Sequence, residues 1–473
     1  MPTVSIQFEP QDRTPRYVRI AESIRQAILR GELAPAAQLP AIRTLAAQLS
    51  VSNATVVAAY RSLQQEGLAR AVRGGGYYVC AAPEAAGGHE VELPPGGIAF
   101  GTTTPEAGLF PIQPFKQALD AVLDRDGGSA FGYQDSNGYA PLRASLAALT
   151  EQEAGCRLQP EDIQIVSGAQ QGIDIVGKAL LHPGDVVLTE TPTYAGALAV
   201  FRSRGAKVVG VPMEGDGIHL GLLEQQLRAQ RPKLVYVMTS FQNPTTVCYT
   251  PDKQAALLRL CRRYGAWVLE DDSMSGLNFD PGRAIRPLKA LDPDNQGALY
   301  LRSFSKLLMP GLRVGYLVAP EILAPSLRRA KHLSDISSSS LLQRALDVYF
   351  REGGWQQHLA ALRAAYEHKY RVMAEGLRAL RPYGLTFADP KGGLNFWLHL
   401  PQKVTDAALY EACLARGVSI MPGKLFYVEP VANEHAVRLS YAATPPEDIR
   451  AGLARLSQAL SALLGPHPGT PEP

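Results

Sequence analysis

A lysine preceded by small hydroxyl residues and followed by an arginine carries the clearest chemical signal in this sequence. The run LRSFSKLLMPGLRVGY spans Leu301–Tyr316 and contains Ser303, Ser305, Lys306 and Arg313. A lysine amine can form a Schiff base with a carbonyl compound, while hydroxyls and a guanidinium fork can bind a phosphate. Together these groups suit a phosphorylated carbonyl compound, although a single lysine in a loop is usually an exposed residue without such a role.

Seven short apolar runs predict the strands that would position these side chains. Because the runs are apolar almost throughout, they are typical of strands buried on both faces of a mostly parallel sheet. Ligands of such sheets lie beyond the carboxyl ends of the strands, so the residues that follow each run matter most. The runs are Ile163–Val166, Val186–Leu188, Lys207–Val211, Leu234–Met238, Ala266–Leu269, Leu299–Leu301 and Val314–Val318.

Residues suited to a flat, phosphorylated ligand follow three of these runs. The stretch Gly168, Ala169, Gln170 opens a helix whose backbone N–H groups can bind a phosphate. Tyr194 offers a ring that can stack on a flat cofactor, and Asn243, fixed before a proline, can donate to a phenolate oxygen. Each feature is common on its own, and their order along the chain is what distinguishes them.

Three acidic residues, Glu270, Asp271 and Asp272, follow the run Ala266–Leu269. A buried carboxylate there can hold a pyridine nitrogen protonated, which makes the ring an electron sink, and we expect Asp271 to have this role. Pyridoxal phosphate is the cofactor that combines such a ring with a carbonyl group and a phosphate. The triplet is also compatible with a metal ion, but no Walker-type loop or partner ligands accompany it, so we expect no metal site.

The first 80 residues predict a small DNA-binding domain. They contain nine arginines, no lysine and five acidic residues, a net charge of +4. Two short helices, one opening at Pro40 and one from Asn53 to Glu66, surround a tight turn and predict a helix-turn-helix. Two strands joined through glycines would follow as a wing. The inward face of the second helix is expected to contain Val56, Val57, Tyr60 and Leu63.

The second helix of this pair is expected to lie in the major groove of double-stranded DNA, with arginines on phosphates. The residues expected at the DNA are Arg43, Ser52, Asn53, Thr55, Arg61, Arg70, Arg73 and Gly75. The alternative interpretation is a helical cap used for dimerisation, on which the arginines are solvated.

Two parts of the chain resemble known families. Residues from about Tyr17 to Val79 resemble a GntR-type winged helix, through LPAIRTLAAQLSVSNATVVAAYRSLQQEGL and a glycine-rich wing ending in YYV. By the order of its motifs, the chain from about residue 98 to 464 resembles a fold-type I aminotransferase, and the combination is typical of MocR regulators. Two positions depart from the DNA-binding pattern, since Ala41 replaces a usual serine and Asn53 a usual arginine.

The aminotransferase resemblance implies a role for each candidate site residue. Lys306 would bind pyridoxal phosphate as a Schiff base, Asp271 would pair with the ring nitrogen, and Arg438 would clamp a substrate carboxylate. Tyr194 would stack on the ring and Asn243 would meet the ring oxygen. The phosphate would be held by Gly168, Ala169, Gln170, Ser303, Ser305, Arg313 and, in the neighbouring subunit, by Tyr133. Ser273 and Met274 stand where the family usually has a tyrosine bonded to the ring oxygen.

The chain is therefore expected to be α/β, with a winged helix-turn-helix ahead of a fold-type I aminotransferase domain. The expected parts are the winged helix (1–80), a flexible linker (81–97), the aminotransferase-like domain (98–464) and a disordered tail (465–473). Within the aminotransferase-like domain, the mostly parallel large domain would span about 124–320. The α+β small domain would combine about 98–123 with 321–464, where residues 321–380 would form two long helices broken near Gly353.

The resemblance implies a homodimeric transcriptional regulator that binds pyridoxal phosphate and an operator and senses an amino acid or amine effector. One alternative is a working aminotransferase with a regulatory or vestigial head. Another is a regulator that has lost the cofactor and only dimerises, against which Lys306, Asp271 and Arg313 argue. Five scattered cysteines without a CxxC fit a reducing cytoplasm, and we find no signal pattern or run of membrane-spanning length.

Overall fold

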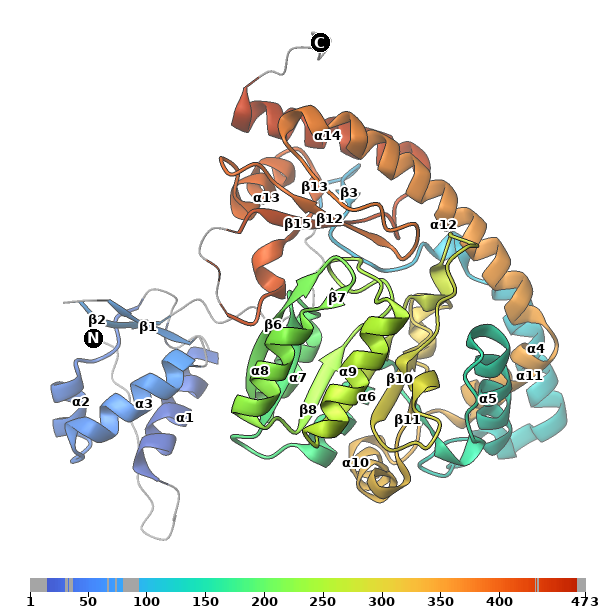
Figure 1. Ribbon diagram of the computed structural model, residues 1–473, viewed down its shortest axis with the longest axis horizontal. Helices are drawn as coiled ribbons and strands as arrows, with labels where there is room; N and C mark the ends of the chain where they lie inside the picture. The colour runs from blue at the N-terminus through green and yellow to red at the C-terminus, as the bar shows by residue number, and fades with distance from the viewer. Residues whose placement is uncertain are drawn as a thin grey trace. The chain divides into compact units, whose positions relative to one another are not determined.

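The computed structural model describes residues 15–29, 33, 37–65, 68–72, 75–79, 93–429, 431 and 434–465. The chain forms two compact units, Met1–Gly88 and His89–Pro473, and we describe each by itself (Figure 1). The division falls within the stretch 81–97 that was expected to be a linker. Residues 81–92 of that stretch and 466–473 of the expected tail lie outside the described residues. No helix of the described residues is long and apolar enough to cross a membrane.

The N-terminal unit is the predicted winged helix-turn-helix. Its helices are α1 (Arg16–Leu29), α2 (Ile42–Gln48) and α3 (Asn53–Gln65), and its wing is the antiparallel pair β1 (Ala69–Val72) and β2 (Gly76–Val79). Pro40, expected in the first turn of a helix, precedes α2 because that helix begins at Ile42. The Tyr60 hydroxyl donates to the carbonyl of Pro40 over 2.7 Å, which ties α3 to the chain entering α2.

One face of α3 belongs to the core of this unit. Val56, Tyr60 and Leu63 are fully buried as expected, but Val57 is half-exposed and Ala59 is buried instead. Positions 56, 59, 60 and 63 follow the spacing of a single helical face, and Val57 is rotated away from that face. The inward assignment of Val57 is therefore wrong.

An eight-stranded, mostly parallel sheet forms the centre of the second unit, as predicted. Strands β5, β6, β8, β9 and β10 pair in parallel, whereas β11 is antiparallel to both β10 and β4, and β7 is antiparallel to β6. The strand order is β4-β11-β10-β9-β8-β5-β6-β7. The strands are β4 (Ile163–Val166), β5 (Val186–Thr191), β6 (Lys207–Glu214), β7 (Gly217–Ile218), β8 (Leu234–Val237), β9 (Trp267–Asp272), β10 (Ala298–Ser303) and β11 (Gly315–Val318).

Helices cover both faces of this sheet. One face packs against α6 (Ala169–Leu180), α7 (Ala195–Ser203) and α10 (Ala324–Asp335). The other face packs against α5 (Ala140–Ala154), α8 (Leu220–Gln230) and α9 (Pro251–Arg263), of which α8 and α9 lie in front of the strands in Figure 1. Burial on both sides accounts for the nearly continuous apolar runs, and the parallel strands deliver their carboxyl ends to one edge.

Two small sheets complete the second unit. β12 (Asn395–His399), β15 (Ala436–Ser440) and β14 (Met421–Pro422) form an antiparallel sheet in that order. β3 (Ile98–Ala99) pairs in parallel with β13 (Val418–Ser419), so the first described strand of this unit lies beside its C-terminal part. α14 (Pro446–Leu464) packs against both α13 (Asp406–Leu414) and the long helix α12 (Gly354–Ala379).

Residues 321–380 contain three α-helices rather than the two expected. The expected break before α12 is present, and a further break separates α10 from α11 (Ser340–Arg351). At this further break Ile336 has a φ of 61°, and Ser339 caps α11 by accepting a hydrogen bond from the N–H of Leu342. The serine-rich sequence around Ser339 supplies a helix cap that ends one helix and starts another.

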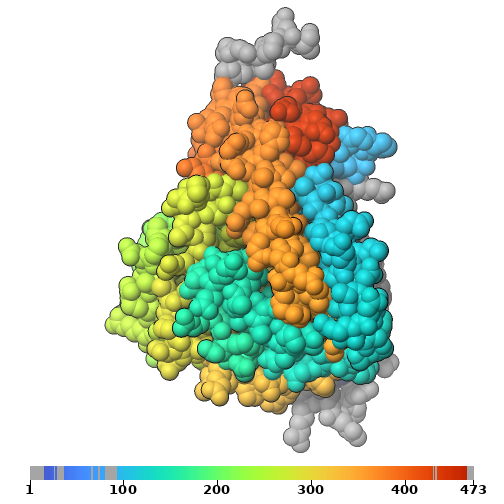
Figure 2. All heavy atoms as spheres, turned by 90° about the vertical axis from the view of Figure 1, so that its right-hand side faces the viewer, coloured from blue at the N-terminus to red at the C-terminus, as the bar shows by residue number. Residues whose placement is uncertain are grey.

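α4 (Ile112–Asp126) packs against α11, and Figure 2 shows the orange band of the long helix α12 beside the cyan region that contains α4. α4 runs through Leu123, the position where the first segment of the small domain was expected to end. Short 3-10 helices are η1 (Ala107–Leu109), η2 (Gly127–Phe131), η3 (Pro160–Asp162), η4 (Ser275–Leu277), η5 (Leu288–Leu291), η6 (Pro310–Leu312), η7 (Glu321–Leu323), η8 (Arg381–Tyr383) and η9 (Gly423–Phe426).

Candidate functional site

Lys306 lies in the loop after β10, and its side chain is half-buried. Its Nζ donates to the carbonyl oxygen of Thr103 over 2.9 Å. Burial, and after it the nearby charges of Arg438 and Arg313, lowers the pKa of this amine to about 8. Because the neutral amine is the nucleophilic form, the surroundings of Lys306 favour attack on a carbonyl group at ordinary pH.

Asp271 lies at the end of β9, directly opposite Leu301 of the neighbouring strand β10. One carboxylate oxygen, Oδ2, accepts a hydrogen bond from the Tyr236 hydroxyl over 2.7 Å, whereas the other, Oδ1, is buried and has no partner among the described residues. Burial, and secondarily the charge of Asp272, raises the pKa of Asp271 to about 7. A buried acceptor left unpaired by the protein is costly, and it suits a ligand that brings a donor.

Glu270 and Asp272, on either side of Asp271 in sequence, belong to the opposite face of β9 and accept hydrogen bonds from other residues of the protein. Glu270 accepts hydrogen bonds from the backbone N–H groups of Leu288 and Lys289 over 2.8 and 3.2 Å. Asp272 accepts from the hydroxyls of Ser275 and Tyr300, both over 2.7 Å. Among the described residues, no group of three or more His, Cys, Asp or Glu side chains is arranged to hold a metal ion.

Small residues and a guanidinium meet where β4 leads into α6. Gly168 precedes α6 with a φ of 84° and gives it no side-chain cap, so the first N–H groups of the helix remain available. A Cβ on Gly168 would lie 2.9 Å from Nη2 of Arg313, which in turn donates to the carbonyl of Ser167 over 2.5 Å. Ser303 and Ser305 are joined by a 3.2 Å hydrogen bond between their hydroxyls. These donors are suited to an anion such as a phosphate.

Tyr194 directly precedes α7, without a side-chain bond to the start of that helix, and its hydroxyl donates to Oε1 of Gln170 over 3.2 Å. Its pKa is raised by burial and then by the nearby charge of Asp271, while Arg438 and Arg313 act in the opposite direction. The ring therefore lies within the electrostatic reach of the acidic and basic groups just described.

Arg438 lies in the middle of β15 and is buried, with 6% of its surface exposed. Its Nη1 donates to Oδ1 of Asn243 over 3.0 Å and its Nη2 to the carbonyl of Gly101 over 2.7 Å, while the ring of Phe426 lies 5.1 Å away. Burial lowers its pKa to about 10, and no carboxylate of the described chain pairs with it. A buried cation held only by neutral acceptors is suited to an anionic ligand group.

Tyr133 stands apart from this set. Its side chain is 87% exposed and makes no hydrogen bond with any described residue of its own chain. Of the two residues at the position of the usual tyrosine, Met274 is buried in the main core and Ser273 is half-buried.

Four residues that hold this site were not identified from the sequence. Tyr236 contacts Asp271, but it lies in an apolar strand whose pattern indicated only burial. Thr103 contacts Lys306, but it does so only through its backbone carbonyl, which leaves no mark in the sequence. Glu190 is fully buried and accepts from the N–H of Met238, the hydroxyl of Tyr249 and the amide of Gln242. Gln242 also donates to the carbonyl of Pro192, so this pair joins the loops that carry Tyr194 and Asn243. A glutamate within an apolar strand was the available signal.

All eight residues expected at DNA belong to the N-terminal unit, and the structure describes seven of them. Arg43, Asn53 and Arg61 are exposed, and no side-chain bond joins them to other described residues. The Ser52 hydroxyl caps α3 by accepting from the N–H of Thr55 over 3.1 Å. The hydroxyls of Ser52 and Thr55 are also hydrogen-bonded to each other over 2.8 Å. Arg70 lies 5.9 Å from the ring of Tyr78. The carbonyl of Gly75 accepts from Gln38, and Arg73 lies outside the described residues.

Two family models match the chain. The model described as aminotransferase class I and II matches residues 106–456, and the model described as bacterial regulatory proteins, gntR family, matches residues 16–79. One match lies within each unit of the structure.

Relatives of two kinds are similar to the chain. The 2-aminoadipate transaminase of Thermus thermophilus is 35% identical over 371 residues, which cover 78% of this chain and 91% of that protein. The probable rhizopine catabolism regulatory protein MocR of Rhizobium meliloti is 29% identical over 473 residues, which cover 95% of this chain and 94% of that protein. The crystal structure of LysN, an α-aminoadipate aminotransferase of Thermus thermophilus complexed with N-(5'-phosphopyridoxyl)-L-leucine, has a TM-score of 0.73. It is 34% identical in sequence to this chain, and the match covers 78% of this chain and 93% of that one.

Proposed function

Because the chain belongs to the aminotransferase class I and II family, and as a MocR-type regulator joins that domain to a GntR winged helix, we propose that it senses an amino acid or related amine. Binding of this effector in the second unit would change the affinity of the first unit for an operator. The observation that carries the proposal is the buried Arg438, which has no anionic partner in the described chain and lies within electrostatic reach of the Lys306 amine.

Pyridoxal phosphate is the cofactor of this family, and the residues of the site fit it. The unpaired Oδ1 of Asp271 would accept from the ring nitrogen, and Lys306 would supply the amine for attachment. Arg313, Ser303, Ser305 and the start of α6 supply donors for the phosphate, and Tyr194 supplies a ring. When bound, the cofactor supplies an electron sink for amino compounds.

The effector is proposed to be recognised by its two charged ends. Arg438 would hold the carboxylate, because exchanging a carbonyl partner for an anion relieves the cost of a buried, unpaired cation. The amine would lie towards Lys306. Differential affinity of this ligand for two arrangements of the protein would then shift DNA binding.

The proposed assembly is a homodimer. Fold-type I sites are completed by residues of both subunits, and the exposed Tyr133 would reach the phosphate of the partner's site. Phe131, which is 68% exposed beside it, would be covered in the same interface. The proposed location of this DNA-binding protein is the cytoplasm.

Fluorescence anisotropy tests the proposal directly. The full chain loaded with pyridoxal phosphate is titrated onto a labelled duplex, which the protein itself has selected from a random pool, with each amino acid added in turn. One class of amino acid is expected to change the affinity by about fivefold or more. An Arg438→Met variant should still bind the duplex but lose this response. Unchanged affinity with every amino acid would contradict sensing.

A second function, transamination, is favoured by the 35% identical transaminase and by the nearly complete set of site residues. It predicts steady, multiple turnovers when an amino acid and a 2-oxo acid are supplied together. A single stoichiometric spectral change without turnover would count against it.

Arg43→Ala is expected to weaken binding to all DNA sequences to a similar degree. Arg43 is exposed and carries a charge suited to a phosphate, so its loss should reduce the slope of log affinity against log salt by about one. Arg228→Ala removes an exposed arginine from the second unit and serves as the matched control. An unchanged slope for the Arg43 variant would remove this residue from the phosphate contacts.

Uptake of pyridoxal phosphate by the cofactor-free protein is expected to depend on the ionisation of Lys306. The pKa of its amine is lowered to about 8, so the reactive neutral form becomes dominant as the pH rises through that value. The rate of the absorbance change should rise and then level off over roughly pH 6 to 10, whereas a model lysine amine, with a pKa near 10.4, should keep rising. A protein profile that follows the model amine would contradict the lowered pKa.

A further inference from the structure

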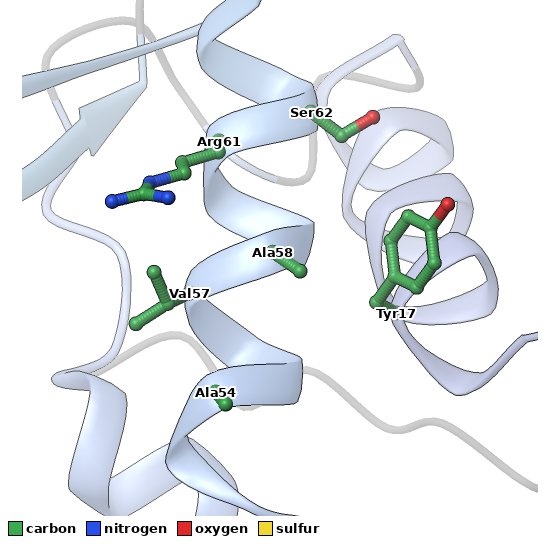
Figure 3. A pocket seen from close by; sticks show the side chains of 6 residues that line it. All are labelled: Tyr17, Ala54, Val57, Ala58, Arg61 and Ser62. Atoms are coloured by element: carbon green, nitrogen blue, oxygen red, sulfur yellow. The ribbon is translucent and has the colours of Figure 1, made fainter.

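The side chains on the outer face of α3 are small and apolar along the middle of the helix. An open hollow between α1 and α3 is lined by Tyr17, Ala54, Val57, Ala58, Arg61 and Ser62 (Figure 3). The five residues from α3 follow the spacing of one helical face, and they lie away from the buried Val56 and Tyr60. Figure 3 shows Val57 and Arg61 pointing to the same side of the helix.

Three polar residues that could read bases, Ser52, Asn53 and Thr55, lie at the start of this helix, and Asn53 is the one whose polar atoms remain available. The hydroxyls of Ser52 and Thr55 bond each other over 2.8 Å, and Ser52 also caps the helix through the N–H of Thr55. Asn53 is exposed, and its amide makes no hydrogen bond with another described residue. An asparagine amide can bond N6 and N7 of adenine as a pair, which matches its two kinds of polar atom.

The surroundings of this face favour DNA as its occupant. Arg61 lies on this face, one helical turn beyond Val57, and Arg43 is exposed on α2 of the same unit, so both cations are available to phosphates. A protein partner with an apolar surface would not require these cations, whereas the major groove places phosphates at both sides of the bases. The apolar group that the major groove offers is the C5-methyl of thymine.

We propose that α3 recognises A·T base pairs, with Ala54 and Val57 packed on thymine methyl groups and Asn53 bonded to an adenine. The proposal rests on the proposed function, in which the first unit binds DNA, and it names the chemistry of the site that this unit prefers. Arg43 and Arg61 would bind the flanking phosphates and leave the choice of base to the other three residues.

Substitution of deoxyuridine for thymidine tests the methyl contacts. The full chain first selects duplexes from a random-sequence pool, and a selected duplex is then remade with single thymines replaced by uracil, which lacks only the methyl group. Affinity should fall by about fourfold for each contacted methyl, the value for burying one such group. Each subunit of the proposed dimer would read one half of the selected sequence, its half-site. Thymines outside the half-sites provide internal controls, because replacing them should leave the affinity unchanged.

A variant assigns the effect to a residue. Val57→Ala should bind the selected duplex more weakly and should lose most of its discrimination between thymine and uracil at one position. Val18→Ala removes an equally apolar, exposed side chain from α1 and should keep the full discrimination. The uracil measurement on the unmodified chain does not depend on the folding of either variant.

The outcomes separate this inference from the function on which it rests. Selection of A·T-rich half-sites that weaken with uracil supports the inference. Equal binding of thymine and uracil duplexes, or selection of half-sites made of G·C pairs, overturns it while DNA binding itself stands. Failure to enrich any duplex overturns the proposed function and the inference together.

Discussion

A Lys306→Ala protein is expected to lose the covalent attachment of pyridoxal phosphate completely. In the native chain the Lys306 amine has a lowered pKa and lies within electrostatic reach of Arg313 and Arg438. Alanine offers no nucleophile, so treatment with borohydride should leave no pyridoxyl group on the variant. The phosphate donors around Arg313 remain, and weaker, reversible binding of the cofactor should persist.

Lys306→Arg separates the charge of the lysine from its chemistry. The guanidinium stays protonated and can still donate to the carbonyl of Thr103, but it cannot form a Schiff base. Absorbance is the measurement to make. Both variants should lack the visible band that attachment of pyridoxal phosphate to Lys306 is expected to give the native protein. A band that survives in either variant, with label on another lysine after digestion, would contradict the role of Lys306.

The sequence predicted the large sheet well because its strands are buried on both faces. Burial left the apolar runs nearly continuous, and each of the seven became a strand of the eight-stranded sheet. The same reasoning placed Asp271 and Lys306 near each other, because the carboxyl ends of parallel strands meet at one edge. The two-residue strand β7 has no such run and was not foreseen.

Contacts made through backbone atoms, and contacts between distant segments, were not visible in the sequence. Arg438 donates to the carbonyl of Gly101, which lies 337 positions earlier in the chain. Tyr236 holds Asp271 from a strand whose pattern indicated only burial. The orientation of Val57 was missed for another reason, since a half-exposed valine beside the apolar face of a helix gives the same sequence pattern as a buried one.

Asp271→Asn is expected to weaken the binding of pyridoxal phosphate and, at the same time, to remove a pH-dependent cost from the cofactor-free protein. The asparagine can still accept from Tyr236 but cannot stabilise a protonated ring nitrogen. Loss of a charge-assisted hydrogen bond should lower the affinity by roughly ten- to a hundredfold. This effect should appear in cofactor titrations followed by absorbance.

The stability of the cofactor-free protein gives an independent measurement with the opposite sign. Burial raises the pKa of Asp271 from 3.8 to about 7, so the folded chain binds a proton that the unfolded chain has released between these values. Native stability should therefore fall as the pH rises through this window, and the Asp271→Asn protein should lack this part of the fall.

Asp272→Asn is the matched control for this prediction. It removes a neighbouring charge whose partners, Ser275 and Tyr300, lie on the other face of β9. It should lower stability without a comparable loss of cofactor affinity. If both variants bind the cofactor equally well, the unpaired oxygen of Asp271 is not the acceptor for the ring nitrogen, and its burial needs another explanation.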